Sequence, residues 1–305
     1  MLFSKIGRFY KRYAALPNKI YRIQEALGRI EQRQVAQCSD FRQAEFRVFS
    51  QWGEDGIVQY LLKYVPVARP IFVEFGVENY TESNTRFLLT NNQWAGLIID
   101  GSAENIDYIK RDAIYWASNL KAEHAFITRE NINGLLSKNG IAGDIGLLSV
   151  DIDGNDYWIW QAIDTISPRI VICEYNSHFG SSAEVTVPYD EAFVRETAHF
   201  SKIYYGVSVA ALCSLAATKG YSLVASNAAG NNVFFVRTDL VGSLPVLPPA
   251  QAYRRAQFRE YHDENGRLTY DDFETRLRKI SHLPLYDLKT KALRKISDIP
   301  GVLTP

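Results

Sequence analysis

The sequence predicts an α/β fold in which a mostly parallel sheet ends in a C-terminal antiparallel hairpin, with helices on both faces. Three observations indicate this fold. Apolar runs of strand length alternate with helical stretches between residues 46 and 240. The last two runs, 221–225 and 232–237, lie too close in sequence for a crossover helix, so we expect them to pair antiparallel. Several earlier runs end in acidic side chains, at the positions where parallel sheets bind ligands.

The expected strands and flanking segments divide the chain into three parts. The strands are residues 71–75, 96–100, 123–127, 146–151, 169–174, 221–225 and 232–237. They fall in a central domain at 46–240. A basic amphipathic helical segment at 1–45 precedes this domain, and a linker with charged helices at 241–305 follows it. The linker begins with a proline-rich stretch, residues 242–249, which interrupts regular structure.

The charge balance argues against a nucleic-acid partner. The 305 residues include 34 Lys+Arg and 34 Asp+Glu, so the chain has no net charge at neutral pH. Its three cysteines, Cys38, Cys173 and Cys213, form neither a disulfide framework nor a CxxC metal pair. No apolar run approaches the ~20 residues of a membrane span, and the N-terminus lacks the features of a signal peptide. We therefore expect a cytoplasmic protein.

The pattern of residues 1–40 leaves three interpretations open. Six basic residues precede the first acidic one, Glu25. Apolar residues recur at three- and four-residue steps, as on an amphipathic helix: Leu2, Phe3, Ile6, Phe9, Tyr10 and Tyr13, then Ile20, Ile23, Leu27 and Ile30. Such a helix can dock on its own domain, drive self-association, or contact the inner face of a membrane as a basic interfacial helix. Docking on its own domain is the first expectation, because amphipathic helices usually cover a core.

Residues 71–85 have the order of a ligand-binding βα unit. The apolar run 71–73 has the character of a buried parallel strand, and Glu74 and Gly76 then lead into a polar loop. The next apolar run ends in Asp100, whose carboxylate can accept hydrogen bonds from both hydroxyls of a ribose. Together, the polar loop after the first strand and the carboxylate at the end of the second favour an adenosine-containing ligand. An ordinary βα turn is the alternative, because the loop contains one glycine and no full glycine-rich motif.

Acidic side chains also end two further strands. Asp151 and Asp153 follow one of them, and Glu174 follows the next. Because the carboxyl ends of parallel strands share one edge of a sheet, we expect these side chains to lie near Asp100. Oxygen ligands from adjacent strand ends suit Mg²⁺, with helix capping alone and a substrate site without metal as the alternatives. His178, in the following loop, is our candidate for a base that deprotonates a substrate hydroxyl.

Four segments resemble those of one enzyme family in order and spacing. They are 49–56 (FSQWGEDG), 96–110 (GLIIDGSAENIDYIK), 147–160 (LLSVDIDGNDYWIW) and 219–237 (KGYSLVASNAAGNNVFFVR). Together they span about residues 46–240 and resemble the FkbM-type methyltransferases. The resemblance implies a class I methyltransferase (Rossmann-like) sheet, S-adenosyl-L-methionine as the cofactor and a sugar or other small hydroxylated metabolite as the acceptor. The chain departs from the family pattern in reading EFGVEN where Asp-x-Gly-Ala-Asn is more usual, and in having Asp153 where Glu is common.

The resemblance also implies roles for individual residues. The cofactor-binding residues it indicates are Gln51, Glu54, Asp55, Glu74, Gly76, Asp100, Ser102 and Asp151. The first three would close the pocket from the N-terminal side. Glu74 and Gly76 would face the methionine part of the cofactor, and Asp100 would hold the ribose with Ser102 close by. Asp151 would lie nearest the transferring methyl group.

We therefore expect an S-adenosylmethionine-dependent O-methyltransferase that acts on a saccharide, glycan or related small metabolite. The base would be His178, with Asp153 and Asp151 as further catalytic candidates, and a Mg²⁺ ion would be held by Asp151, Asp153 and Glu174. Two alternatives remain: a non-catalytic binding module on the same fold, and a nucleotide-dependent α/β transferase or oxidoreductase. The second alternative needs a phosphate-cradling glycine loop, and residues 74–82 contain one glycine.

Overall fold

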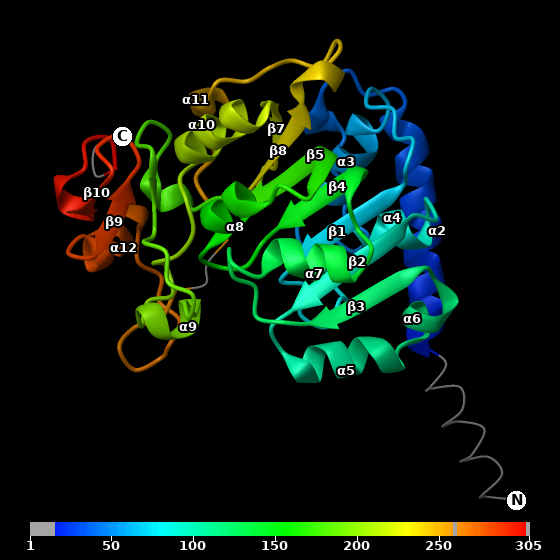
Figure 1. Ribbon diagram of the computed structural model, residues 1–305, viewed down its shortest axis with the longest axis horizontal. Helices are drawn as coiled ribbons and strands as arrows, with labels where there is room; N and C mark the ends of the chain where they lie inside the picture. Colours follow the sequence, from blue (N-terminus) through cyan, green and yellow to red (C-terminus); the bar gives the residue numbers. More distant parts are fainter. Residues whose placement is uncertain (1–15, 259–260, 303–305) are drawn as a thin grey trace, which may run out of the picture.

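A seven-stranded sheet forms the centre of the protein (Figure 1). The computed structural model describes residues 16–258 and 261–302. The strands are β1 (Ile71–Phe75), β2 (Ala95–Asp100), β3 (Leu120–His124), β4 (Gly143–Val150), β5 (Ile166–Glu174), β7 (Tyr221–Ser226) and β8 (Asn232–Arg237). Their order is β3-β2-β1-β4-β5-β8-β7, and β8 runs antiparallel to both of its neighbours. The predicted α/β class, with parallel strands closed by a C-terminal hairpin, is confirmed.

Helices connect the strands and cover both faces of the sheet. They are α4 (Arg86–Thr90), α5 (Ala103–Arg111), α6 (Ala113–Ala117), α7 (Ile132–Lys138), α8 (Asp156–Ala162) and α10 (Val209–Lys219). In Figure 1, α7 and α8 lie in front of the sheet and α4 lies behind it. Because α8 contacts both α7 and α10, these three helices form one layer.

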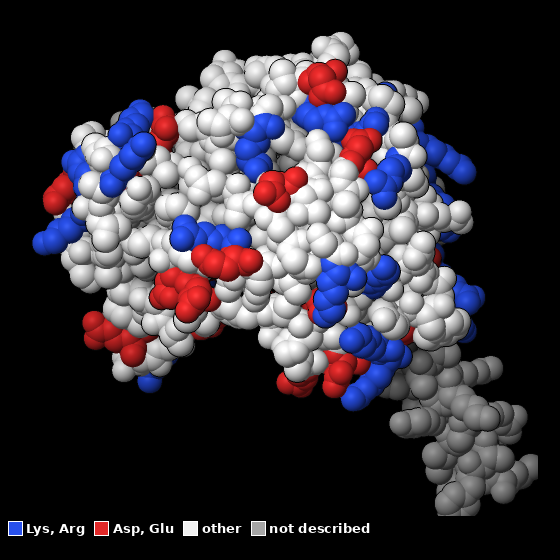
Figure 2. Space-filling model, viewed as in Figure 1, with Lys and Arg blue, Asp and Glu red and all other residues white. Residues whose placement is uncertain are grey.

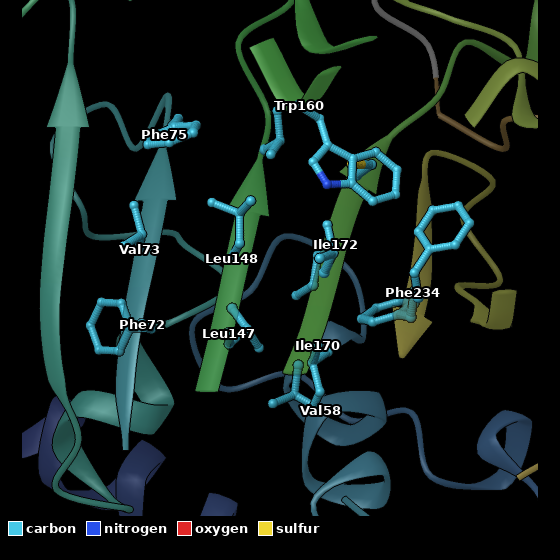
Figure 3. Close-up of a cluster of buried hydrophobic side chains, with 14 of the residues drawn as sticks. Val58, Phe72, Val73, Phe75, Leu147, Leu148, Trp160, Ile170, Ile172 and Phe234 are labelled. Carbon is cyan, nitrogen blue, oxygen red and sulfur yellow. The ribbon is translucent and has the colours of Figure 1, made fainter. Parts of the chain in front are cut away.

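Apolar side chains from adjacent strands fill the interior. Figure 3 shows Leu148 on β4 and Ile172 on β5 near Trp160, which reaches the sheet from α8. The Trp160 side chain is fully buried, and its ring lies 5.1 Å from the ring of Phe235 on β8, measured between centroids. The central strands are buried on both faces, which explains why their sequences are continuous apolar runs.

The third strand begins earlier than the sequence indicated. β3 covers Leu120–His124, whereas the prediction was 123–127. Within β3, Leu120 and Ala122 are buried and alternate with polar residues, because this strand lies at the edge of the sheet. Alternation at an edge gives a weaker apolar signal than a central strand does. Residues 125–127, which were predicted to belong to the strand, form a loop after β3. This loop contains the half-exposed Phe126.

The C-terminal region contains strands where charged helices were predicted. α11 (Pro249–Ala252) and α12 (Phe273–Ile280) are helical, but β9 (Pro284–Asp287) and β10 (Ala292–Lys295) form a second sheet with β6 (Val185–Thr186). Both C-terminal strands have four residues, too few for periodicity to separate a strand from a helix. β9 pairs with β6, which lies far earlier in the chain, so no local signal indicates that pairing.

A second apolar core joins this small sheet to the chain that follows β5. Val185, Val187 and Ile203 pack there with Leu285 and Ile296. The first three belong to the segment assigned to the central domain, so the C-terminal region is attached through a shared core. Figure 1 shows the small sheet and α12 at the left of the molecule, near α9 (Arg195–Ala198).

The helix α2 (Leu16–Val35) lies at the opposite side of the molecule, at the right of Figure 1. It is part of the predicted N-terminal segment, whose residues 1–15 lie outside the described residues. One face of α2 docks on the central domain: Tyr21 stacks on Phe49 with 5.0 Å between ring centroids, and Val35 is buried in the main core. Among residues 16–258 and 261–302, none of the helices combines the length and apolar character that crossing a bilayer requires.

Gly56 allows α3 (Glu54–Leu61) to pack closely on the chain that precedes it. A Cβ atom at residue 56 would overlap the carbonyl oxygen of Ala44 and the backbone nitrogen of Phe46. Backbone atoms cannot move aside as the end of a flexible side chain can, so any side chain at this position forces α3 outward. The contact gives a structural reason for a glycine at this point of the FSQWGEDG segment.

We expect Gly56→Ala to lower the free energy of unfolding by about 2–3 kcal/mol, because the added methyl group overpacks a rigid contact. Gly134→Ala is the matched control, since Gly134 lies within α7 and a Cβ there would meet no atom within 4 Å. That change should raise stability by about 0.5–1 kcal/mol through helix propensity. Urea unfolding followed by circular dichroism measures both changes, and equal effects of the two would contradict the close contact at Gly56.

Candidate functional site

The strand order reverses between β1 and β4, and the carboxyl ends of these two strands form the candidate site. From β1 the sheet continues through β2 and β3 on one side, and from β4 through β5 on the other. Open α/β sheets bind ligands at such a reversal. Gly76, the residue after β1, has a φ of 68°, and a Cβ on it would overlap the carbonyl oxygen of Asp151, the residue after β4. Glycine is therefore required where the two segments touch.

Two cavities share a wall at this contact. The acidic cavity has a volume of about 350 Å³, and its lining includes Gln51, Glu74, Asp151, Glu174 and Arg195. The Asp100 cavity has a volume of about 400 Å³, and its lining includes Asp100, Ser102, Asn105, Phe126 and Ile127. The residues that line both are Gly76, Glu78, Asp151, Asp153, Arg195 and Glu196. One extended ligand can therefore occupy the two cavities together.

Asp100 is fixed at the end of β2 by the loops around it. Its Oδ1 accepts hydrogen bonds from the backbone N–H of Ser102 at 2.8 Å and from Nδ2 of Asn105 at 3.3 Å. Its Oδ2 accepts a hydrogen bond from the backbone N–H of Glu78 at 2.8 Å. Ser102 in turn caps α5, with its Oγ accepting from the backbone N–H of Asn105. The carboxylate of Asp100 thus ties the loop after β1 to the start of α5.

Glu74 lies on β1 and lines the acidic cavity while it holds the loop that leads into α4. Its Oε1 accepts a hydrogen bond from the backbone N–H of Asn84 at 2.8 Å, and its Oε2 accepts from the backbone N–H of Thr85 at 3.2 Å. The hydroxyl of Thr85 also donates to Oε2. Burial raises the pKa of Glu74 to about 7. Glu74 therefore shapes the cavity through a loop that it anchors.

Asp151, Asp153 and Glu174 come together at the strand ends. Carboxylate oxygens of the three residues lie within 4.8 Å of one another. Asp153 has a φ of 55°, so a turn rather than strand alternation brings it to Asp151. Burial, together with the charges of Asp153 and Asp156, raises the pKa of Asp151 well above its usual range. Burial and the charge of Asp151 raise the pKa of Glu174 in the same way.

Arg195, from α9, brings a positive charge to this cluster. It forms an ion pair with Asp153, and its guanidinium carbon lies 3.9 Å from the ring centroid of Tyr205. One arginine does not balance the three carboxylates of the cluster, so the acidic cavity favours a positively charged ligand. Arg195 was not predicted from the sequence, because it lies in a long irregular segment between β6 and α10 with no motif around it.

The three carboxylates also fit a divalent cation. The Glu174 side chain is buried, at 6% exposure, yet its Oε2 accepts no hydrogen bond from any described residue. A buried carboxylate oxygen without a donor is unfavourable unless a ligand satisfies it. Three carboxylates from adjacent strand ends form the oxygen-rich donor set that Mg²⁺ prefers.

Glu54 and Asp55 are not among the described residues that line either cavity, although they were predicted to close the pocket. Oδ2 of Asp55 accepts hydrogen bonds from the three backbone N–H groups that precede Gln51, at 2.8–2.9 Å. Oε1 of Glu54 accepts from the side-chain amides of Asn227 at 2.6 Å and Asn232 at 3.0 Å. The two acidic residues therefore brace the loop, and Gln51 is the residue of this motif that lines the acidic cavity.

His178 lies apart from the acidic cluster, contrary to the sequence-based expectation. It is buried in the short helix Ser177–Phe179, stacks on Phe273 with 4.8 Å between ring centroids, and lines a different cavity of about 410 Å³ beside α12. The side-chain amide of Asn176 donates to two backbone carbonyls, so its Oδ1 accepts from Nδ1 of His178 at 2.9 Å. Burial lowers the pKa of His178 to about 3. The structure does not bring this imidazole to Asp151.

Residues of the C-terminal segment complete the acidic cavity. Phe258, His262 and Leu268 contribute to its lining. The ring of Phe258 stacks on Trp52, with 5.6 Å between centroids, and so connects this segment to the FSQWGEDG loop. These residues follow the linker and carry no recognisable pattern, so the sequence offered no signal for their place in the site.

Among known proteins, this chain is similar to solved structures in its fold. No protein-family model matches the chain, and no curated protein sequence matches it. Similar solved structures include the N-terminal domain of EvdMO1 with SAH bound, at 12% identity and a TM-score of 0.42, which covers 68% of this chain and 95% of that one. The CurJ carbon methyltransferase has 10% identity and a TM-score of 0.40, covering 60% of this chain and 52% of that one. An S-adenosylmethionine-dependent methyltransferase from Clostridium acetobutylicum ATCC 824 has 12% identity and a TM-score of 0.32, covering 54% and 63%.

The burial of Glu74 predicts a pH dependence of stability. Its pKa rises from 4.5 to about 7 on folding, so the folded state holds the proton more tightly than the unfolded chain does. Ionised Glu74 therefore destabilises the fold progressively as the pH rises from about 4.5 through 7. Relative to the wild type, Glu74→Gln should gain about 2–3 kcal/mol of unfolding free energy between about pH 5 and pH 8. Chemical unfolding of both proteins tests this, and parallel pH profiles would contradict the raised pKa.

Proposed function

We propose that the protein transfers a methyl group from S-adenosyl-L-methionine to a hydroxyl oxygen of a small hydroxylated molecule, with saccharides as the substrate class. The observation that carries this proposal is the pair of cavities that share a wall at Gly76 and Asp151. One contains a strand-end carboxylate suited to a ribose, and the other is acidic. A cofactor lying across the shared wall would present its methyl group to a substrate in the acidic cavity.

The Asp100 cavity suits the adenosine half of this cofactor. Asp100 can accept a hydrogen bond from the ribose, and the half-exposed ring of Phe126 offers an apolar surface to the adenine. The single glycine in residues 74–82 is compatible with this ligand, because no phosphate has to be cradled. The sulfonium of the cofactor carries a positive charge, which the carboxylates around the shared wall stabilise.

The acidic cavity suits a polar acceptor with a ring. The aromatic side chain of Phe258 and the polar groups of Gln51 and His262 line it together. An aromatic face beside hydrogen-bonding groups matches the two surfaces of a sugar ring, one apolar and one rich in hydroxyls. This combination supports a saccharide acceptor over a purely apolar one.

The reaction would be an in-line displacement. The acceptor oxygen forms a bond to the methyl carbon as the carbon–sulfur bond breaks, and the sulfonium becomes a neutral thioether. Alignment of the two reactants at about 3 Å would supply most of the acceleration. The hydroxyl proton passes to a base. Asp151 suits that role because it lies at the shared wall with a raised pKa, whereas Asp153 is paired with Arg195 and His178 lines another cavity.

A Mg²⁺ ion in the acidic cavity would be held by Asp151, Asp153 and Glu174, and bound there it supplies a Lewis acid that lowers the pKa of an acceptor hydroxyl. The unpartnered Oε2 of Glu174 supports this site. As a metal ligand Asp151 could not also accept the proton. The two roles of Asp151 are therefore alternatives that one measurement separates.

We expect the protein to bind S-adenosylmethionine with a Kd well below millimolar, measured by titration calorimetry. Asp100→Asn should weaken binding about tenfold or more, because a hydrogen bond to a charged acceptor contributes about 1.5–3 kcal/mol. Asp107→Asn, at an exposed position of α5, is the matched control and should bind as the wild type does.

Three outcomes of binding and activity measurements separate the competing functions. Binding that is absent below millimolar, or a preference for NAD over S-adenosylhomocysteine, would contradict the proposal. Tight binding without transfer to any hydroxylated acceptor would favour the non-catalytic module.

We expect exhaustive EDTA treatment to lower methyl transfer to a hydroxyl acceptor at least about tenfold, with recovery on addition of Mg²⁺. Glu174→Gln should weaken the activation by Mg²⁺, because it removes one of the three carboxylates. Initial rates measured across a Mg²⁺ titration test both. Activity that survives EDTA would exclude an essential cation and assign the base role to Asp151.

A further inference from the structure

The outer face of α2 carries an apolar stripe that no described residue covers. The stripe consists of Leu16, Ile20, Ile23, Leu27 and Ile30, which are 46%, 61%, 60%, 57% and 51% exposed. Single exposed aliphatic residues are ordinary on protein surfaces. Five of them in one line along a helix form a contiguous apolar surface, which marks an interaction site.

A different set of residues docks α2 on its own domain. Nε2 of Gln32 donates a hydrogen bond to Oε1 of Gln59 at 2.7 Å. Gly28 is buried, and a Cβ on it would collide with the side chain of Val48. Val35 belongs to the main core. Since these residues hold α2 in position, the stripe is not needed to fold the single chain.

The spacing of the stripe is that of a coiled coil. Its residues follow one another at steps of four, three, four and three, which are the alternating d and a positions of a heptad. The same spacing continues towards the N-terminus, outside the described residues, through Tyr13, Phe9, Ile6 and Leu2. At 3.6 residues per turn the stripe is about 80° wide. Helices that cover a core or lie on a membrane usually have a face of about 100° or more, so this narrow stripe fits one partner helix.

We propose that two copies of this chain associate through this stripe, with α2 of one copy packing along α2 of the other as a two-stranded coiled coil. A second copy supplies the same 4-3 spacing, so the apolar side chains of each helix meet matching gaps in the other. Because the inner face of α2 already packs on the central domain, only the stripe remains to contact a second helix. The association is therefore limited to a dimer.

An anionic membrane is the competing occupant of the stripe. Lys19, Arg22 and Arg29 are exposed on α2, and Figure 2 shows basic side chains along the right edge of the molecule, where this helix lies. A basic amphipathic helix can lie on anionic lipids. The regular heptad spacing and the width of the stripe favour the partner helix, since neither is required by a lipid surface.

Analytical ultracentrifugation of the full chain at micromolar concentrations tests the proposal. We expect the wild type to sediment with twice the mass of one chain, and Ile23→Glu combined with Ile30→Glu to sediment with the mass of one. Val246→Glu is the matched control, because Val246 is 61% exposed but does not belong to the stripe, and it should stay at twice the mass. Circular dichroism confirms that each variant is folded. If the variant with glutamate at both positions does not fold, Ile23→Gln combined with Ile30→Gln replaces it, because glutamine is a good helix former.

Three outcomes would overturn the proposal. One is a wild type with the mass of a single chain. Another is a double-mass species that persists in the Ile23 and Ile30 variant, which would assign the association to a different surface. The third is a single-chain wild type that floats with vesicles of phosphatidylserine and phosphatidylcholine and is released by the same substitutions, which would assign the stripe to a membrane.

Discussion

The site depends on how closely the chain approaches itself where the strand order reverses. β1 and β4 are neighbours in the sheet, but their following segments leave in different directions, and Gly76 and Asp151 touch at the point of divergence. The contact leaves no space for a side chain at residue 76. It fixes Asp151 at the wall between the two cavities, and it sets the distance between a ligand in one cavity and a ligand in the other. Any widening here would change both cavities at once, so the geometry of the whole site rests on one backbone contact.

The acidic residues of this region differ in whether they accept hydrogen bonds from the backbone of a loop. Asp55 and Glu74 each accept several hydrogen bonds from backbone N–H groups, so their charges are used to hold loops. Glu174 keeps a buried oxygen without a donor, and the pKa values of Asp151 and Glu174 are raised by burial and by the charges of neighbouring carboxylates. Carboxylates of the first kind fix the conformation of loops, whereas the unpartnered oxygen of Glu174 makes the site unfavourable without a ligand. Backbone hydrogen bonds therefore mark the residues that hold the loops, and the unpartnered oxygen of Glu174, which lines the acidic cavity, marks a position for a ligand.

The central strands and the gathering of Asp100, Asp151, Asp153 and Glu174 at one edge were predictable, because long apolar runs and parallel pairing follow from local sequence. β3, β9 and β10 were missed or misplaced, because edge strands and four-residue strands give a weak periodic signal and because the partner of β9, β6, is distant in the chain. The roles of the acidic residues were less predictable, since Asp55 and Asp151 look alike until their hydrogen bonds are known. His178 was assigned to the site from its position after a strand, but the helical turn that contains it packs it against Phe273 instead.

The hydrogen bonds around Asp100 limit how it can recognise a ribose. A carboxylate has about four lone-pair directions, and loop groups from Glu78, Ser102 and Asn105 already use three of them. One direction remains for an incoming hydroxyl. In the proposed function a ribose diol would then be held at one hydroxyl, unless the amide of Asn105, the longest of the three contacts at 3.3 Å, were displaced. In the proposed function, Asp100 would therefore contact one hydroxyl of the sugar and leave the other to the shape of the cavity, so we expect cofactor analogues altered at that second hydroxyl to bind.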